Sequence, residues 1–407
     1  MRPPLFAGLL PHPPPCTSVL ERTPTMTTLA PEKPVTTATP VRAHGVLDIG
    51  PGGAGFLRAP DLLPTSHDVQ VPASLVRRLG LRRGDLVDGT CARARGALTT
   101  VDTVDGLPAE AARQRPRFAD LTPLHPAERL RMESPGGGLA GRVVDLFAPV
   151  GKGQRGLVVA PPRTGKTVLL QQLAAAVATN HPEAHLMVVL VDERPEEVTD
   201  MQRSVRGEVF ASTFDRPAKA HIALAELAVA RAQRLVERGR DVVILLDSLT
   251  RLCRAHNNAA SAGGRTLSGG VDAGALQGPK RLFGAARNTE EAGSLTILAT
   301  ALVETGSRAD DFFFEELKST GNMELRLDRS LAQHRVHPAV DLAPSGTRRE
   351  ELLLGAEESA AAHALRRALG RRDDRTSYEA LLERMRQTPD NATFLRQVRS
   401  ADPAPAA

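Results

Sequence analysis

The segment LVVAPPRTGKTVLL, residues 157–170, joins an apolar strand-like run to a helix-like run through a short polar loop. A strand, a tight loop, Gly-Lys-Thr and a helix in this order are typical of a phosphate-binding loop. Backbone N–H groups at the helix start would bind phosphate oxygens, Lys166 would contact the terminal phosphates, and Thr167 would offer a hydroxyl to Mg²⁺. The usual first glycine is Ala160 here, so the loop alone leaves open a chance Gly-Lys-Thr at a helix start.

Acidic residues follow two further apolar runs. Asp247 ends the run VVILLD, 81 residues after Lys166, and Glu193 follows the run HLMVVLV. An acid at the carboxyl end of a parallel strand is where a metal-bound nucleotide lies, and a glutamate there can orient or deprotonate water. An ordinary strand-capping role stays open for Asp247, and Glu196 and Glu197 are interpreted as surface charges at a helix start. Together the three elements favour a nucleotide-hydrolysing site.

The surrounding pattern predicts an α/β domain over residues 141–355. Apolar runs at 155–160, 185–192, 207–213, 241–248 and 293–303 alternate with helix-length runs such as 167–180 and 220–239. Continuous apolar strands alternating with helices indicate a mostly parallel sheet covered on both faces.

The flanking regions have a different texture. Residues 46–105 are short alternating runs separated by Gly, Pro and Asp, which predict a small β-barrel or sandwich of about five strands. Residues 106–140 form a Pro/Arg-rich connector, and residues 356–407 are expected to be a short helical segment with a flexible tail. Residues 1–45 are rich in Pro and Thr and are expected to be disordered; a true start at Met26 would exclude residues 1–25.

Composition excludes several classes of protein. Among 407 residues, 41% are hydrophobic and 24% are charged, as in globular proteins, and no apolar run approaches the ~18–20 residues of a membrane span. Three distant cysteines, Cys16, Cys91 and Cys253, form neither a disulfide framework nor a zinc site. They fit a reducing compartment, so a cytoplasmic location is expected. The net charge of 52 − 47 = +5 is compatible with a polyanionic partner but does not require one.

Longer segments carry a family resemblance. The stretches GKGQRGLVVAPPRTGKT, LVDERPEEVTDMQR, ILLDSLTRL, LSGGVDAGAL, GSLTILATALVETGSR and SGTRREELLLG resemble the Rho family of bacterial transcription termination factors, with a match from about residue 44 to 355. A loop that lacks the first glycine is itself typical of that family. The resemblance implies a RecA-like P-loop ATPase core preceded by an all-β OB-fold domain of the cold-shock type, assembled as a homohexameric ring. It also implies ATP-driven 5′-to-3′ movement on single-stranded RNA that releases the transcript from RNA polymerase, with ATP and Mg²⁺ as cofactors and with elongation factors among the partners.

The resemblance also assigns residues of the ATPase site. It implies catalytic roles for Lys166, for Glu193 as the residue that activates water, and for Arg348 as an arginine finger given to a neighbour's ATP. Thr167 and Asp247 would hold Mg²⁺. Without the family, Arg348 reads as an ordinary helix-start arginine and His337 as a surface histidine. The implied nucleotide contacts are Gly151, Lys152, Gly153, Gln154, Arg155, Gly156, Arg163, Thr164, Gly165, Lys166, Thr167, Val168, Arg194 and His337.

Two RNA sites follow from the same resemblance. The primary site on the OB-fold comprises Gly53, Ala54, Gly55, Phe56, Leu57, Arg58, Asp68, Val69, Gln70, Arg93, Ala94 and Arg95. The secondary site in the ring channel comprises Arg265, Lys280, Thr305, Gly306, Ser307 and Arg308, within or near two loops at 261–270 and 304–308. Glycine loops that carry isolated cations suit sequence-independent contacts to a phosphate backbone.

The primary site departs from the family pattern. Ala54 replaces a phenylalanine, Gln70 replaces a tyrosine, and the segment 93–95 lacks another tyrosine; the chain's one tyrosine is Tyr378. Stacking of bases on aromatic rings stabilises single-strand binding by ~1–3 kcal/mol per base. RNA binding that is more salt-dependent and less cytosine-selective than usual for the family is therefore expected.

Two alternatives stay open. The first is a RecA-like subunit of a rotary or secretion ATPase, which shares the core but carries a different β-barrel and keeps the first loop glycine. The second is a ring that binds RNA but turns ATP over weakly because its aromatic surface is reduced. ATP hydrolysis with and without RNA separates the second from the leading hypothesis.

Overall fold

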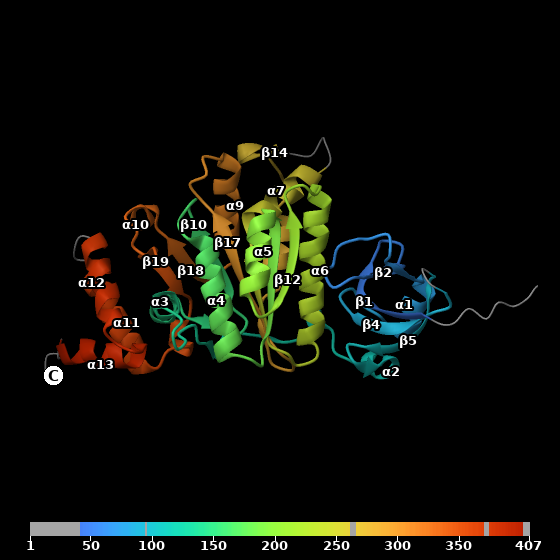
Figure 1. Cartoon of the computed structure of the whole chain (residues 1–407), viewed down its shortest axis with the longest axis horizontal. Helices are drawn as coiled ribbons and strands as arrows, with labels where there is room; N and C mark the ends of the chain where they lie inside the picture. Colours follow the sequence, from blue (N-terminus) through green and yellow to red (C-terminus); the bar gives the residue numbers. More distant parts are fainter. Residues whose placement is uncertain (1–40, 94–95, 261–265, 370–373, 402–407) are drawn as a thin grey trace, which may run out of the picture. The chain divides into compact units, whose positions relative to one another are not determined.

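Residues 41–108 form a six-stranded antiparallel sheet. The computed structural model describes residues 41–93, 96–260, 266–369 and 374–401, with elements labelled in Figure 1. The strand order is β3-β2-β1-β4-β5-β6, and helix α1 (Ala73–Leu79) follows β3. The strands are β1 (Val41–Ile49), β2 (Gly55–Arg58), β3 (Val69–Val71), β4 (Leu86–Cys91), β5 (Leu98–Val104) and β6 (Leu107–Pro108). The predicted all-β domain is confirmed, with one short strand more than expected.

The edges of this sheet lie outside the predicted limits of 46 and 105. Strand β1 begins at Val41, and Ala43 already packs in the core with Leu47 and Leu57. At the other edge, Leu107 and Pro108 pair with the end of β5. Pairing continues past the alternating runs because backbone hydrogen bonds need no particular side chain.

A second sheet forms the core of the chain. Its seven strands lie in the order β12-β11-β13-β17-β10-β18-β19, and all neighbours run parallel except β18 and β19. This is the predicted mostly parallel sheet. Its strands are β10 (Arg155–Ala160), β11 (His185–Glu193), β12 (Glu208–Thr213), β13 (Val242–Asp247), β17 (Leu295–Leu302), β18 (Met323–Leu327) and β19 (Val340–Thr347).

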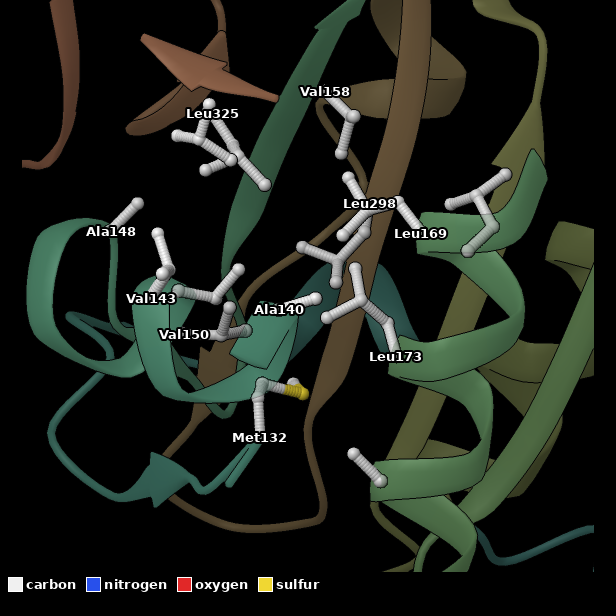
Figure 2. Close-up of a cluster of buried hydrophobic side chains, with 14 of the residues drawn as sticks. Met132, Ala140, Val143, Ala148, Val150, Val158, Leu169, Leu173, Leu298 and Leu325 are labelled. Atoms are coloured by element: carbon white, nitrogen blue, oxygen red, sulfur yellow. The ribbon is translucent and has the colours of Figure 1, made fainter. Parts of the chain in front are cut away.

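Both faces of this sheet are buried. Alternate residues of β10 enter different clusters: Val158 and Ala160 pack with α3 (Leu139–Phe147) and α4 (Lys166–Asn180), whereas Leu157 and Val159 pack with α6 (Ala218–Val236) and α7 (Leu249–Ala259). Figure 2 shows part of the first cluster, where side chains of α3 and α4 meet those of the strands. Two-sided burial explains why the strands appear in the sequence as continuous apolar runs.

The remaining elements are short connections and outer helices. They include α2 (Ala109–Ala112), β7 (Pro123–Leu124), β8 (Arg129–Leu130), β9 (Val150–Gly151), α5 (Pro195–Ser204), β14 (Thr266–Leu267), β15 (Val271–Asp272), α8 (Gln277–Phe283), β16 (Asn288–Thr289), α9 (Arg308–Lys318) and α10 (Arg329–Gln333). Three 3-10 helices are η1 (Phe118–Asp120), η2 (Ser268–Gly270) and η3 (Glu350–Leu352). Three helices then follow: α11 (Ala356–Leu369), α12 (Asp374–Arg386) and α13 (Asn391–Ala401).

A search of the described residues for a bilayer-spanning helix gives none of sufficient length and apolarity.

Candidate active site and nucleic-acid interfaces

The loop between β10 and α4 has the backbone shape that binds phosphate. Arg163 and Gly165 both have positive φ angles, +66° and +87°, and the Thr164 hydroxyl donates to the Pro161 carbonyl at 2.8 Å. Gly165 caps the N-terminus of α4, where its φ favours glycine. Ala160 is still inside β10, paired with Leu302, so this position is extended and accommodates a side chain. The missing first glycine is therefore compatible with the loop.

Three charged residues from three elements meet at this loop. Lys166 Nζ lies 2.5 Å from Asp247 Oδ1 at the end of β13 and 3.7 Å from Glu193 Oε2 at the end of β11. The Thr300 hydroxyl of β17 also donates to Asp247 Oδ1, at 2.8 Å. Parallel strands bring their carboxyl ends to one edge of the sheet, so residues 81 positions apart become neighbours.

Glu193 is deeply buried, with 2% of its surface exposed. Burial raises the pKa of its carboxyl above the usual range, and the nearby Lys166 charge opposes that shift. Arg251 Nη1 lies 3.0 Å from Glu193 Oε2, and the same guanidinium donates to the Asp192 carbonyl. Yet Glu193 Oε2 accepts no hydrogen bond from the described residues. A buried carboxylate with a raised pKa and a free acceptor suits a base that takes a proton from water.

Arg251, Thr300 and Glu197 are contacts that sequence reasoning missed. Arg251 lies in the segment ILLDSLTRL quoted above, but no function was predicted for it. The sequence feature that could have indicated it is its position four residues after Asp247, at the start of α7. The Thr167 hydroxyl donates to Glu197 Oε2 at 3.2 Å, so Glu197 belongs to the site, whereas the neighbouring Glu196 is exposed.

The oxygen ligands at the loop suit Mg²⁺. The Thr167 hydroxyl, the Asp247 carboxylate and the Glu197 carboxylate are hard oxygen donors beside the loop. Among the described residues no group of three or more His, Cys, Asp or Glu side chains forms a metal site by itself.

Three other predicted nucleotide contacts lie around the loop. His337 approaches Gly165: a Cβ at that glycine would lie 3.8 Å from His337 Nδ1. Val168 is exposed on the first turn of α4. Arg194 is also exposed, and its Nη1 lies 3.7 Å from Glu197 Oε1. All three are accessible to a nucleotide in the loop.

The predicted contacts at 151–156 lie at the other edge of the sheet. Lys152 Nζ pairs with Glu128 Oε1 at 2.5 Å and with Asp241 Oδ2 at 2.8 Å, and Asp241 precedes β13, which ends at Asp247. The Gly153 N–H donates to the Thr296 hydroxyl, and the Gln154 amide donates to Asn322 Oδ1. These residues precede or begin β10, whereas the loop follows its end, so the structure does not bring them to the loop of the same chain.

Arg348 also lies at that far edge. Its N–H donates to the Asn322 carbonyl, and the Asn322 N–H donates to the carbonyl of Arg155, the first residue of β10. A six-residue strand spans ~20 Å, so exposed Arg348 is separated from its own loop by about that length. Burial lowers the pKa of Arg155, and the charges of Arg287 and Arg348 lower it further. Exposed Arg348 therefore lies away from the phosphate-binding loop of its own chain.

The predicted primary RNA site forms one face of the first sheet. Phe56 of β2 is 42% exposed and lies directly opposite Gln70 of β3, which is also exposed. The Arg58 guanidinium carbon lies 5.4 Å from the Phe56 ring centre, and Arg58 pairs with Asp68 at 2.5 Å and with Asp48 at 2.8 Å. Gly53, Ala54 and Gly55 lead into β2, Leu57 points into the core, and Val69 begins β3. Arg93 is exposed, whereas Ala94 and Arg95 lie outside the described residues.

The two predicted channel loops are adjacent. A Cβ at Gly269 would lie 2.9 Å from the Ala309 nitrogen and 3.0 Å from the Arg308 carbonyl carbon. The Thr305 hydroxyl donates to Asp310 Oδ2 at 2.6 Å, Gly306 has positive φ, and Ser307 caps α9, which begins at Arg308. Lys280 pairs with Glu316 at 2.5 Å; Arg265 lies outside the described residues. The structure therefore brings Thr305, Gly306, Ser307 and exposed Arg308 beside the glycine loop.

Comparisons with known proteins match both parts of the chain. Residues 140–347 match the ATP synthase alpha/beta family nucleotide-binding domain, and residues 43–110 match the Rho termination factor RNA-binding domain. Among solved structures, a prototypical ATPase from a bacterial type III secretion system is 24% identical with a TM-score of 0.54, covering 61% of this chain and 70% of that one. The assembled ATPase EscN from the type III secretion system of enteropathogenic E. coli is 18% identical with a TM-score of 0.57, covering 76% and 79%. At these identities the likeness shows the fold alone, and the secretion-ATPase alternative is not favoured.

Curated relatives are much more similar. A transcription termination factor Rho of Streptomyces coelicolor is 70% identical over 386 residues, covering 95% of this chain and 92% of the relative. A Rho of Streptosporangium roseum is 59% identical, covering 87% of this chain and 91% of the relative. A Rho of Mycobacterium tuberculosis is 54% identical, covering 88% and 61%. With the RNA-binding domain match at 43–110, these identities show that the chain belongs to the Rho family of transcription termination factors.

Proposed function

We propose that this protein is an RNA-dependent ATPase that moves 5′ to 3′ along RNA and terminates transcription by releasing the transcript from RNA polymerase. It acts in the cytoplasm as a homohexameric ring, with elongation factors among its partners. The observation that carries the proposal is the convergence of Lys166, Asp247 and Glu193 in one chain with a sheet that exposes Phe56 and matches an RNA-binding domain.

Different residues at the loop bind phosphate, activate water and hold Mg²⁺ during hydrolysis. Backbone N–H groups at the start of α4 bind phosphate oxygens, and Lys166 exchanges its pair with Asp247 for the terminal phosphates. Glu193 accepts a proton from the attacking water, and Arg251 holds the Asp192–Glu193 segment by its contact with the Asp192 carbonyl. Thr167 and Asp247 are the residues that would hold Mg²⁺, which neutralises phosphate charge when bound.

Arg348 completes the site from a neighbouring subunit. Its distance from its own loop leaves the nucleotide of an adjacent chain as its target, where a guanidinium would stabilise charge that develops in the transition state. Residues 151–156 share that edge, so their nucleotide contacts would also be made across the interface. RNA held by the loops at 266–270 and 304–308 contacts α9, whose Asp310 pairs with Arg254 of α7 at 2.5 Å. Helix α7 also carries Arg251, which contacts Glu193. Helix α7 therefore links the proposed RNA site to the nucleotide site.

The test is the rate of ATP hydrolysis by the purified protein without RNA, with poly(C) and with poly(A). Strong stimulation by RNA is expected, with a small ratio between the two polymers because Gln70 stands where a second aromatic would stack. Lys166→Ala is the blank, since it removes the phosphate contact. A basal rate that RNA leaves unchanged, in a protein that still binds ATP, contradicts the translocase.

A further inference from the structure

A basic groove lies beside the first sheet, at the start of the connector. Its lining includes Arg77 and Gly80 at the end of α1, Arg113 and Arg117 after α2, Phe118, and Arg234 of α6. We call it the connector groove. Its volume is about 700 Å³, and Gly80 touches Arg113, since a Cβ at this glycine would lie 3.5 Å from Arg113 Cγ. Residues far apart in the sequence thus share one concave surface.

The groove has a strong excess of positive charge. Five arginines line it, namely the four named above and Arg82, against a single carboxylate, that of Glu237. Glu237 is buried and already paired, with Arg82 at 2.9 Å and with Arg234 at 2.8 Å. Arg77, Arg113 and Arg117 are exposed, and none has an ion-pair partner among the described residues. Their charges are available to an anion from solution.

Arg234, one of the lining arginines, is itself mostly buried. Arg234 is 9% exposed, and its Nε donates no hydrogen bond to the part of the chain that the structure describes. Buried N–H donors without a partner are uncommon because each costs ~1–3 kcal/mol. The Arg234 charge therefore adds to the positive potential of the groove, whereas direct contacts to an anion are left to the exposed Arg77, Arg113 and Arg117.

The connector groove offers charge but no aromatic surface. The Phe118 ring is buried, and the Arg287 guanidinium covers it at 5.1 Å. A base therefore has no exposed ring on which to stack. Arginines that surround an open groove instead contact phosphates without regard to base identity.

The groove is also connected to the predicted primary RNA site through helix α1. Gly53 of that site lies against Ala73, the first residue of α1, and a Cβ at Gly53 would lie 3.8 Å from Ala73 Cβ. The seven residues of α1 span ~10 Å, and its last turn carries Arg77 to the groove. An RNA strand that leaves the face around Phe56 would need to extend only ~10 Å further to reach Arg77.

We propose that the connector groove binds the phosphate backbone of RNA that continues from the OB-fold site, through Arg77, Arg113 and Arg117, without base preference. This inference rests on the proposed function, because it assumes that RNA occupies the Phe56 face. The arginine-rich connector would bind phosphates without regard to base, whereas the face around Phe56 would bind bases by stacking.

The test compares the full chain with the triple variant Arg77→Gln/Arg113→Gln/Arg117→Gln. RNA affinity is measured by fluorescence anisotropy at several salt concentrations, with cytidine and adenosine oligomers of about 4 and about 16 nucleotides, which bracket OB-fold site sizes. For the longer oligomers the slope of log K against log[salt] should become shallower by about 2, since each phosphate contact contributes about 0.7. The loss should be equal for cytidine and adenosine and absent for the short oligomers.

Arg78→Gln is the matched control, because Arg78 is an exposed arginine on the same helix that does not line the groove. The slope of log K against log[salt] for Arg78→Gln should differ from that of wild type by no more than about 0.7, the contribution of one phosphate contact. A triple variant with an unchanged slope, or one equally weakened on the short oligomers, overturns the groove. The proposal is also overturned if inorganic pyrophosphate binds the wild type through these three arginines but long RNA binds the triple variant as tightly as it binds the wild type. Failure of the wild type to bind any RNA would instead overturn the proposed function.

Discussion

Glu193 is the residue on which the proposed hydrolysis depends most directly. Replacing it with glutamine keeps its size but removes the proton acceptor, so ATP turnover should fall by about 10²–10⁴ while ATP binding persists. Burial raises the pKa of the carboxyl, so wild-type kcat should decline as the pH falls through a value above the ordinary ~4.3. Stopped-flow nucleotide binding and a pH series of kcat measure both effects.

The same shift makes a stability prediction with the opposite sign. A carboxyl whose folded pKa is raised loses stability as pH rises through that pKa, because burial disfavours the charged form more than the nearby Lys166 and Arg251 charges favour it. Glu193→Gln should therefore unfold at the same or a higher temperature than wild type at neutral pH. A large fall in melting temperature together with lost turnover would indicate a structural role instead.

Gln70 offers a gain-of-function prediction on the RNA face. Because it lies directly opposite exposed Phe56, Gln70→Tyr should supply a second stacking surface worth ~1–3 kcal/mol, or at least about fivefold in affinity for cytidine RNA. Competition between poly(C) and poly(A) at two salt concentrations measures it. Gln202→Tyr, at an exposed glutamine of α5, is the control and should change neither affinity nor base preference.

The sequence predicted some of these residues and not others for a physical reason. Lys166, Glu193 and Asp247 follow recognisable strands, and parallel strands must end together. Arg251 and Glu197 reach the site with long side chains from helix starts, and their reach depends on packing that no local pattern records. Gln154 and Lys152 sit in a segment whose resemblance implies nucleotide contact, yet local pairing holds them at the opposite edge.

At the scale of elements, one buried arginine makes several of the hydrogen bonds between the core and the C-terminal helices. Arg142 of α3 donates to the carbonyls of Met385 and Thr388 and to Asn391 Oδ1, at 2.5, 2.8 and 3.0 Å. Its removal leaves these buried acceptors without a partner, which costs about 3–5 kcal/mol when a buried charged network is broken. Arg142→Ala should lower the melting temperature and expose α12 and α13 to proteases.

Arg386→Ala is the matched control for that variant. Arg386 is exposed on α12, and among the described residues its one ion pair is with Glu383 one turn away, at 3.1 Å. Surface pairs of this spacing contribute about 0.3–0.5 kcal/mol, so melting and proteolysis should be close to wild type. Equal behaviour of the two variants would mean that the helices are held by their apolar contacts, such as Phe394 and Met385, and not by Arg142.

Strands β18 and β19 were not predicted, and their exposure explains why. In MELRL, residues 323–327, buried positions alternate with half-buried Glu324 and Arg326, so no continuous apolar run marks the strand. Strand β19 is the edge strand of the sheet, and β18 is its neighbour. The central strands were predictable because burial on both faces leaves apolar residues at nearly every position.

At the scale of the whole molecule, the proposed finger role of Arg348 predicts an active site built from two chains. A ring of Lys166→Ala subunits lacks the phosphate contact, and a ring of Arg348→Ala subunits lacks the finger, so each should be nearly inactive. Loss of the finger should lower ATP turnover by about 10³–10⁵. In co-expressed mixed rings, the finger of a Lys166→Ala subunit can serve the intact loop of an Arg348→Ala neighbour. Random mixing makes about a quarter of the interfaces complete.

ATP turnover of such mixed rings, purified through two different tags, should therefore exceed that of either parent by far. Mixed rings of Lys166→Ala and Glu193→Gln are the control, because Lys166 Nζ and Glu193 Oε2 lie 3.7 Å apart in one chain and every loop then lacks one of them. No recovery is expected there. No recovery in the Lys166→Ala and Arg348→Ala mixture would mean that the finger does not act between chains, and recovery in the control would mean that recovery does not depend on the finger. The ~20 Å between Arg348 and its own loop would then require another explanation, since β10 is held on both sides by β17 and β18 and cannot shorten.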